Sequence, residues 1–282
     1  ARQGSAEGAG ASAAKRWPLI WRASLAIAVV ALVAVISAFA LYGKAVREIG
    51  PLSMTDAEQL SVSVVDRDGK LLRPFTTADG RWRLPLEPDH VDQRYLKILM
   101  AFEDVRFYQH RGVDAHAVTR AVLQAAKHGR LVSGASTLTM QVARLVDGKH
   151  ERTGSGKLRQ IARAIQLEKK FSKTEILRLY LRLAPFGGNI EGVRAASLAY
   201  FGKEPRRLSI GEAALLVALP QSPEARRPDR HPEAAKRARA RVLDRAVVAG
   251  VISTAEAEKA KAERMPLARL EFPKLAPHLA EA

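Results

Sequence analysis

The sequence predicts a mainly α-helical domain that follows a single membrane-spanning helix and a short β-hairpin. Three observations predict this fold class: an uncharged run near the N-terminus, an alternating stretch around an Asp-Gly pair, and three Ser-x-x-Glu capping boxes in the second half of the chain. We expect a cytoplasmic tail, an anchor, a linker with the hairpin, a main domain and the start of a second linker, at residues 1–22, 23–43, 44–90, 91–265 and 266–282.

The predicted anchor is a run of 21 residues without charge, Ala23–Gly43. At 1.5 Å per residue, a helix of this length crosses a hydrocarbon core of roughly 30 Å. Four bases and one acid precede the run, so we expect a single-pass protein of the cytoplasmic membrane with its N-terminus inside and its main domain on the periplasmic or extracellular face. A signal peptide cleaved after Ala38-Phe39-Ala40 is the alternative, although the run is long for one.

The next elements follow from local patterns. The stretch "SVSVVDRDGKLLRPF" alternates on both sides of Asp68-Gly69, which predicts a short hairpin. From about residue 91 the patterns are helical: Asp114 can cap a helix that runs to His128, and a further helix is expected from Pro232 to Ala249. The capping boxes predict three more helix starts, at Ser172/Glu175, Ser209/Glu212 and Ser253/Glu256.

Composition describes a folded and strongly basic chain of 282 residues, with 47% hydrophobic and 27% charged residues and a net charge of +17. The absence of cysteine excludes disulfides, thiolate catalysis and cysteine metal sites. Nucleic acid is the usual partner of a basic chain, but an exported location favours anionic lipid head groups and lipid-linked phosphates, so we expect no nucleic-acid partner. The basic segment 226–245 is either a solvated helix face or a contact with lipid head groups.

Two stretches carry residues that could do chemistry. In "AFEDVRFYQHRGVD", an apolar helical stripe runs into Glu103, and a carboxylate at the edge of such a face is partly desolvated, which suits a general base. His110 and Asp104 could orient it or ligate a metal, while a solvated acid is the alternative. In "GASTLTMQVARL", a helix starting near Ser136 places Thr137, Gln141 and Arg144 on one stripe; a capped amphipathic helix is the alternative.

Other motifs fail. The stretch "TGSGKL" lacks the glycine and the Ser or Thr of a phosphate-binding loop, because Glu151 and Leu158 stand there. The Ser-x-x-Lys motif occurs at Ser12 to Lys15, in the predicted tail, so the chain shows no transpeptidase site.

The two chemical stretches resemble the motifs E-D-x-x-F-x-x-H-x-G and G-x-S-T-x-T-x-Q-x-x-K/R of the peptidoglycan glycosyltransferases, glycosyltransferase family 51, in the family's order. Three later stretches resemble the remaining motifs: "KLRQIARAIQLEKKFSKTEILRLYL", "APFGGNIEGVRAASLAYFGK" and "LSIGEAALLVALPQSPEARRPDR". The resemblance implies a lysozyme-like domain that polymerises the lipid-linked precursor lipid II into a growing glycan strand with inversion, releasing undecaprenyl pyrophosphate.

The resemblance also implies residue roles. Glu103 matches the catalytic glutamate, the general base on the acceptor hydroxyl, and Arg144 and Lys157 match basic positions beside the leaving pyrophosphate. The other matched substrate-binding positions are Asp104, Phe107, His110, Gly112, Ser136, Thr137, Gln141 and Glu168. No cofactor is fixed; a divalent cation, Mg²⁺ or Mn²⁺, at the pyrophosphate stays open. Further expected partners are the membrane and other cell-wall synthesis proteins, and a transpeptidase domain is expected to follow residue 282.

Two departures from the family pattern affect these roles. Gln160 stands where many members carry a second glutamate, which puts any metal at that position in doubt, and Arg182 stands where they carry asparagine. Because Glu103 and the basic positions remain, we expect an active glycosyltransferase. The alternatives are a lysozyme-like lytic enzyme, which has no use for Arg144 and Lys157, and a catalytically silent scaffold that binds glycan or a synthase partner.

Overall fold

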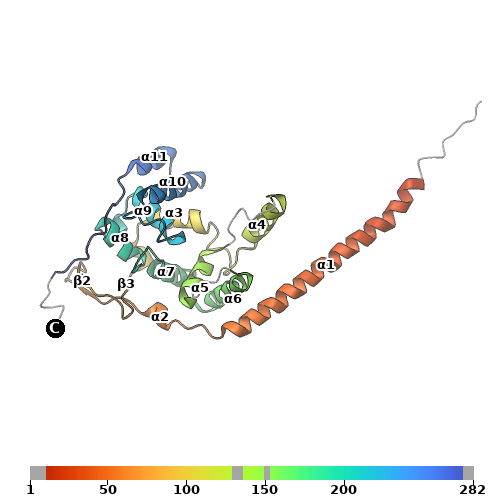
Figure 1. The fold of residues 1–282 in the computed structure, drawn as a ribbon, viewed down its shortest axis with the longest axis horizontal. Coiled ribbons are helices and arrows are strands. Elements are labelled where there is room, and N and C mark those ends of the chain that lie inside the picture. Colours follow the sequence, from red (N-terminus) through yellow and green to blue (C-terminus); the bar gives the residue numbers. More distant parts are fainter. Residues whose placement is uncertain (1–10, 129–135, 149–152, 276–282) are drawn as a thin grey trace, which may run out of the picture. The chain divides into compact units, whose positions relative to one another are not determined.

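The computed structural model describes residues 11–128, 136–148 and 153–275. The chain forms two compact units, residues 1–50 and 51–282 (Figure 1). The first unit is one long helix, α1 (Ala11–Ile49), which contains the predicted anchor. Among the described residues, no helix combines the length and the apolar character needed to cross a membrane. The span at residues 23–43 therefore stays a prediction.

The second unit is mainly helical, as predicted. Its helices are α2 (Thr55–Glu58), α3 (Gln93–Glu103), α4 (Ala115–His128), α5 (Leu138–Asp147), α6 (Gly154–Lys170), α7 (Lys173–Leu183), α8 (Val193–Phe201), α9 (Ile210–Ala218), α10 (Pro232–Val248) and α11 (Thr254–Ala262). The 3₁₀ turns are η1 (Pro88–His90), η2 (Pro205–Arg207) and η3 (Leu219–Gln221), and the strands are β1 (Ser63–Val65), β2 (Leu71–Pro74), β3 (Trp82–Arg83) and β4 (Ile190–Glu191).

The predicted hairpin is confirmed: β1 and β2 pair in antiparallel fashion. Its turn is stabilised by Asp66, whose Oδ1 accepts hydrogen bonds of 2.9 Å from the backbone N–H groups of both Asp68 and Lys70. Gly69 has a φ of 77°, the left-handed conformation that glycine adopts without strain. An Asx turn and one glycine therefore fix the reversal of the chain.

The predicted helix starts are also confirmed. All three capping boxes form, each with the serine side chain accepting from the N3 backbone N–H and the N3 glutamate accepting from the serine N–H. Asp114 caps α4, because its Oδ1 accepts from the N–H of Ala117 at 3.1 Å. Helix α5 begins at Leu138, two residues after the predicted start, and its N-cap is Thr137.

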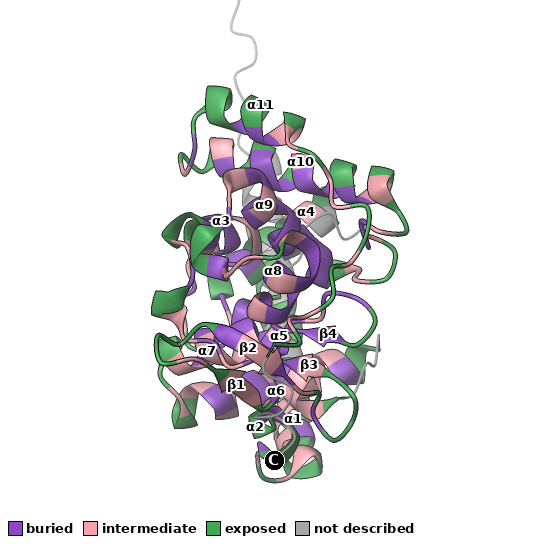
Figure 2. Ribbon diagram, turned by 90° about the vertical axis from the view of Figure 1, so that its left-hand side faces the viewer, coloured by how far each residue is buried: buried purple, intermediate pink, exposed green. Residues whose placement is uncertain are grey.

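Helix α9 is the centre of the fold, because nearly all of its residues are apolar and buried. It packs against α3 and α10, and a second group of helices is formed by α5 with α6 and α7. Figure 2 shows the buried residues of α8 and α9 in the middle of the unit, with exposed residues on the outer faces of α10 and α11. The catalytic candidate Glu103, at the end of α3, lies next to this core.

Residues 51–90 belong to the same compact unit rather than to a separate linker. Leu84 and Leu86 are buried in its hydrophobic core, and β3 pairs in parallel with β4. Beside this pairing Arg83 and Glu191 form a buried ion pair, with Arg83 Nη2 2.6 Å from Glu191 Oε2. The segment before residue 91 is thus part of the fold that holds the site.

Candidate active site

Glu103 is the last residue of α3, and its carboxylate is held by two amides from other elements. Oε2 accepts a hydrogen bond of 2.7 Å from Gln141 Nε2 on α5. Oε1 accepts one of 2.9 Å from Gln221 Nε2 at the end of η3. The preceding turns of α3 bury Ile98 and Leu99 in the core, which fixes the end of the helix where the carboxylate emerges.

The environment of Glu103 shifts its acidity in the direction that a general base requires. Burial raises the pKa of the Glu103 carboxyl above its ordinary value. The hydrogen bonds from Gln141 and Gln221, and the positive charges of Arg245 and Arg226, oppose this shift and keep it limited. The result is a carboxylate more basic than one in water yet bound in one orientation.

Asp104 and His110 hold the loop that follows Glu103. The Asp104 carboxylate lies 2.9 Å from His110 Nε2, and its Oδ2 accepts a hydrogen bond of 2.9 Å from the N–H of Leu138 at the start of α5. Phe107 is fully buried in the same loop, and Lys173 lies over its ring. These contacts give Asp104, Phe107 and His110 a supporting position behind Glu103.

Thr137 and Gly112 join the same loop to α5 and α6. The Thr137 hydroxyl accepts from the N–H of Met140 at 3.2 Å and donates to the carbonyl of Gly112 at 2.6 Å. Gly112 has a φ of 86°, and a Cβ there would lie 3.1 Å from the backbone of Ala164 on α6. Only glycine fits this close approach without strain.

A cavity of about 630 Å³ opens beside Glu103. Its wall combines three acids, four arginines, neutral polar side chains and a few apolar groups. The lining residues are Phe102, Glu103, Asp104, Val105, Arg106, Asp114, Ala117, Arg120, Ser136, Thr137, Gln141, Arg144, Gln221 and Arg245. The structure thus brings five of the predicted substrate-binding residues, at positions 104, 136, 137, 141 and 144, into one cavity with Glu103.

Positive charge gathers along one side of this cavity. Arg144 lines it from α5, and Lys157, on α6, lies next to it and donates a hydrogen bond to the hydroxyl of the lining residue Ser136. Burial, followed by the charge of Arg144, lowers the pKa of the Lys157 ammonium. Two cations held this close favour an anionic ligand with more than one charge between them.

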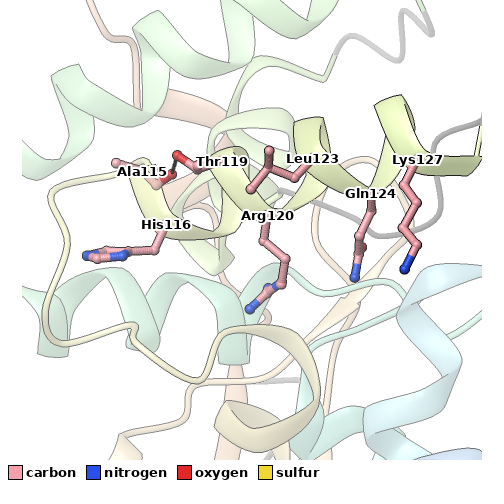
Figure 3. A pocket seen from close by; sticks show the side chains of 7 residues that line it. All are labelled: Ala115, His116, Thr119, Arg120, Leu123, Gln124 and Lys127. Atoms are coloured by element: carbon pink, nitrogen blue, oxygen red, sulfur yellow. Dashed lines mark hydrogen bonds between the residues drawn. The ribbon is translucent and has the colours of Figure 1, made fainter. Parts of the chain in front are cut away.

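A second hollow lies along α4 (Figure 3). It has a volume of about 530 Å³ and is lined by one helix, with Arg120, Gln124 and Lys127 projecting from the same side. Arg120 also lines the cavity beside Glu103. Because α4 alone contributes to its wall among the described residues, this hollow adds a basic helix face to the approach of the main cavity rather than a separate site.

Comparison with known proteins assigns the family. The model of the family described as "Transglycosylase" matches residues 68–247. The chain belongs to the transglycosylase family. This match includes Glu103, all residues of its cavity and the hairpin turn, so the transglycosylase domain begins before the expected boundary at residue 91.

Curated relatives of the transglycosylase domain are penicillin-binding proteins. The chain is 48% identical to penicillin-binding protein 1C of Escherichia coli (strain K12) over 230 residues, 82% of this chain and 30% of that protein. It is 34% identical to penicillin-binding protein 1F of Bacillus subtilis (strain 168), over 73% of this chain and 29% of that one. It is 37% identical to penicillin-binding protein 1A of Vibrio cholerae serotype O1, over 73% of this chain and 24% of that protein.

The chain therefore spans less than a third of the length of these relatives. A crystal structure of penicillin-binding protein 1A from Haemophilus influenzae aligns with 79% of this chain and 23% of that one, at 21% identity and a TM-score of 0.41. A score this low carries no argument about shared architecture, so the lysozyme-like fold stays a prediction.

Like Phe107, His110, Gly112 and Lys157, three further residues that were singled out in the sequence do not line the cavity of the transglycosylase domain. Glu168 accepts hydrogen bonds of 2.6 Å from Thr139 and from Lys173, so its carboxylate joins α6 to α5 and α7. Gln160 lies 3.5 Å from the Lys157 ammonium. Arg182 donates to the carbonyl of Leu86 at 3.0 Å and pairs with Glu87, which explains an arginine at this position as a contact with the segment before residue 91.

Sequence reasoning missed several lining residues of the transglycosylase domain. Gln221 and Arg245 reach the cavity from η3 and α10, more than 100 positions after Glu103. Arg106, Arg120 and Asp114 line it from the loop after α3 and from α4. Gln221 lies in one of the stretches that resemble the family's motifs, but nothing in that stretch marks the residue itself, whereas the excess of bases in segment 226–245 could have drawn attention to Arg245.

The donor set around the basic side of the cavity does not fit a divalent cation. Lys157, Arg144, Ser136 and Gln160 offer positive or neutral groups, whereas Mg²⁺ and Mn²⁺ prefer carboxylate oxygens. Throughout the described residues, no group of three His, Asp or Glu side chains could hold a metal ion.

Proposed function

We propose that this chain polymerises a lipid-linked disaccharide diphosphate, lipid II, into glycan strands for the bacterial cell wall. The observation that carries the proposal is the pairing of a desolvated, hydrogen-bonded Glu103 with Arg144 in one cavity, next to Lys157. Membership of the transglycosylase family supports the same reaction class.

The proposed step is an inverting displacement with Glu103 as general base. The acceptor sugar hydroxyl attacks the anomeric carbon of the donor sugar and forms a new carbon–oxygen bond while the bond to the diphosphate breaks. The hydroxyl proton moves to the Glu103 carboxylate. Its raised pKa makes this transfer more favourable than to an ordinary surface carboxylate.

The leaving diphosphate gains negative charge as its bond breaks. Arg144 and Lys157 are the groups that we assign to that charge, because they lie together on the basic side of the cavity and Arg144 Nε has no hydrogen-bond partner among the described residues. Cations placed where charge develops stabilise the transition state more than the ground state. A lytic enzyme that hydrolyses preformed glycan produces no such anion.

Membrane attachment at the outer face of the cytoplasmic membrane is part of the proposal. It is supported by the 21 uncharged residues at 23–43 and by exposed apolar side chains in the body, Val105 in the cavity wall and Leu123 on α4. A lipid-linked substrate keeps its hydrocarbon tail in the bilayer, so its enzyme must reach the membrane surface. Loss of vesicle binding on removal of residues 1–50 is the test of this attachment.

The proposed function predicts that Glu103→Gln abolishes polymerisation while the fold remains. The substitution keeps the shape of the side chain and removes the base, and general-base catalysis contributes about 10²–10⁴-fold, so we expect at least a 100-fold lower rate. The measurement is formation of glycan chains from purified lipid II in vesicles. The matched control is Glu233→Gln on the exposed side of α10, which should leave the rate unchanged.

The same assay separates the alternatives. Polymer formation supports the glycosyltransferase, degradation of preformed glycan with no polymer supports the lytic reading, and binding without any product supports the scaffold. Normal polymerisation by the Glu103→Gln variant would refute the role of Glu103.

A further inference from the structure

Gln221 is held between Glu103 and an arginine. Its Nε2 donates to Glu103 Oε1 at 2.9 Å, and its Oε1 accepts a hydrogen bond of 3.0 Å from Arg226 Nη1. The same Arg226 nitrogen donates to the carbonyl of Ala218, at the end of α9, at 2.7 Å. Three hydrogen bonds therefore form a chain that begins at the core helix and ends on the catalytic carboxylate.

The order of this chain of hydrogen bonds fixes which end of the Gln221 amide faces Glu103. A glutamine amide carries a donor and an acceptor, and rotation by 180° would turn its oxygen toward the carboxylate, where like partial charges repel. A guanidinium has donors only. Arg226 therefore selects the orientation in which the amide oxygen faces the arginine and the NH₂ group faces Glu103.

We propose that Gln221 and Arg226 are positioning residues for the reaction, with Arg226 acting through Gln221 to set the orientation and the proton affinity of the Glu103 carboxylate. The proposal rests on the proposed function of Glu103 as general base and deepens it. With Gln141 on the other oxygen, Gln221 completes a pair of donors, from α5 and η3, that fixes the plane of the carboxylate.

The other groups near Glu103 do not replace this pair. Arg245, from α10, donates its Nε to the carbonyl of Ala101 at 3.2 Å, and the carboxylate of Asp104 is occupied by His110 and the N–H of Leu138. Arg106 is paired with Asp114. Among residues 11–128, 136–148 and 153–275, the remaining charged or titratable groups near Glu103 are Arg120 and Arg144, which line the same cavity, and Tyr95 and Tyr180 in the core, whose pKa values burial and the Glu103 charge raise.

The proposal predicts a specific pH effect of Gln221→Leu. Removing a donor to the charged form raises the pKa of Glu103, so the acidic limb of the rate profile moves to higher pH, by about one unit for a hydrogen bond to a charged group. At a pH well above the acidic limbs of both the variant and the wild type, the rate of the variant recovers toward that of the wild type. Gln93→Leu, a matched change at an exposed glutamine at the start of α3, should leave the profile unchanged.

Substitutions of Arg226 test the relay, which is the proposed action of Arg226 on Glu103 through Gln221. Arg226→Leu should move the acidic limb in the same direction, and Arg226→Lys should move it less because it keeps a donor and a charge. Arg226→Leu should add less in the Gln221→Leu background than in the wild type, because only the direct effect of the arginine charge on Glu103 then remains. Additive shifts would show that Arg226 acts independently and would overturn the relay. Equal loss of rate at every pH would overturn the positioning role of both residues.

A second readout keeps this proposal separate from the proposed function. The Glu103 side-chain carboxyl is titrated by ¹³C NMR in the whole chain, with its resonance identified by its loss in Glu103→Gln. If the wild type makes no glycan, the proposed function fails but the titration still decides. An upward shift in Gln221→Leu, with an Arg226→Leu shift that is smaller in the Gln221→Leu background than in the wild type, supports action of Arg226 through Gln221. Additive shifts or identical titration curves overturn it.

Discussion

The carboxylate of Glu103 meets two opposing demands. A base must be free enough to accept a proton, yet it must be held so that its lone pairs face the acceptor sugar. Each carboxylate oxygen accepts one amide hydrogen bond, which leaves a second lone pair on each for the proton. Neutral amides achieve this without the large loss of basicity that a direct ion pair with arginine would cause.

The raised pKa of Glu103 has a consequence for stability. A carboxyl whose pKa is higher in the folded chain binds its proton more tightly there, so the charged form destabilises the fold above its ordinary pKa and has no such effect below it. As the pH rises from about 4 to 7, the wild type should lose stability relative to Glu103→Gln. The difference in the free energy of unfolding, variant minus wild type, should therefore increase with pH. Urea denaturation at several pH values measures this difference.

A difference between the two proteins that does not change with pH would contradict the raised pKa. The control is the exposed Glu233→Gln, for which we expect a difference close to zero throughout.

At the scale of single residues, the sequence identified side chains but not their partners. Glu103, Gln141 and Arg144 could be predicted because their motifs are short and local. The structure places all three in the wall of one cavity. Glu168 was matched by position and instead joins three helices through Thr139 and Lys173. The position of a residue in a motif does not predict whether its side chain faces the cavity or the neighbouring helices.

At the scale of elements, the start of α5 determines the geometry of the site. Its N-cap, Thr137, fills two roles at once, because its hydroxyl both caps the helix and holds the carbonyl of Gly112. The Asp104 carboxylate also accepts from the N–H of Leu138. The loop after Glu103 and the helix that carries Gln141 and Arg144 are thus tied together at one point.

We therefore predict that Thr137→Val destabilises the fold by about 1–3 kcal/mol, since it removes a helix cap and leaves the Gly112 carbonyl without its donor. Chemical denaturation measures this loss. Thr137→Ser keeps the hydroxyl and should retain most of the stability, whereas Thr137→Val keeps the methyl group. If serine were destabilising and valine were not, packing of the threonine methyl group and not the hydrogen bonds would be responsible.

Helix starts that depend on neighbouring residues were the best predicted elements. The three capping boxes and the Asp114 cap need only residues within three positions, so the sequence contains the whole interaction. The start of α5 was predicted two residues early, because both Ser136 and Thr137 can cap a helix and the choice depends on the distant Gly112 carbonyl. The parallel pairing of β3 with β4 has no local pattern at all.

At the scale of the whole molecule, residues 44–90 were predicted to be a linker with a hairpin, and residues 51–90 of this segment belong to the compact unit. Glu87 pairs with both Arg178 and Arg182 on α7, and Arg83 pairs with the buried Glu191. The hairpin side chain Leu71 is buried in the common core. These contacts join sequence positions about 100 residues apart, so no window of sequence could reveal them.

The division into units predicts how shortened chains behave. Residues 51–282 form their own compact unit, so a fragment of these residues should unfold cooperatively and at the same temperature as the body of the whole chain. A fragment of residues 91–282 loses the core side chains Leu71, Leu84 and Leu86, each worth about 1.5–3 kcal/mol. It also loses Arg83, the ion-pair partner of Glu191, and the pairing of β3 with β4.

Because a domain is stable by only about 5–15 kcal/mol in total, these losses should leave the shorter fragment without a cooperative transition. Circular dichroism during heating compares the two fragments. A control for the ion pair alone is Glu191→Gln in the longer fragment, which should lower the unfolding temperature and keep the transition. Cooperative unfolding of the 91–282 fragment at the temperature of the 51–282 fragment would mean that the segment before residue 91 lies on the fold without supporting it, and that Glu103 is positioned by the helices alone.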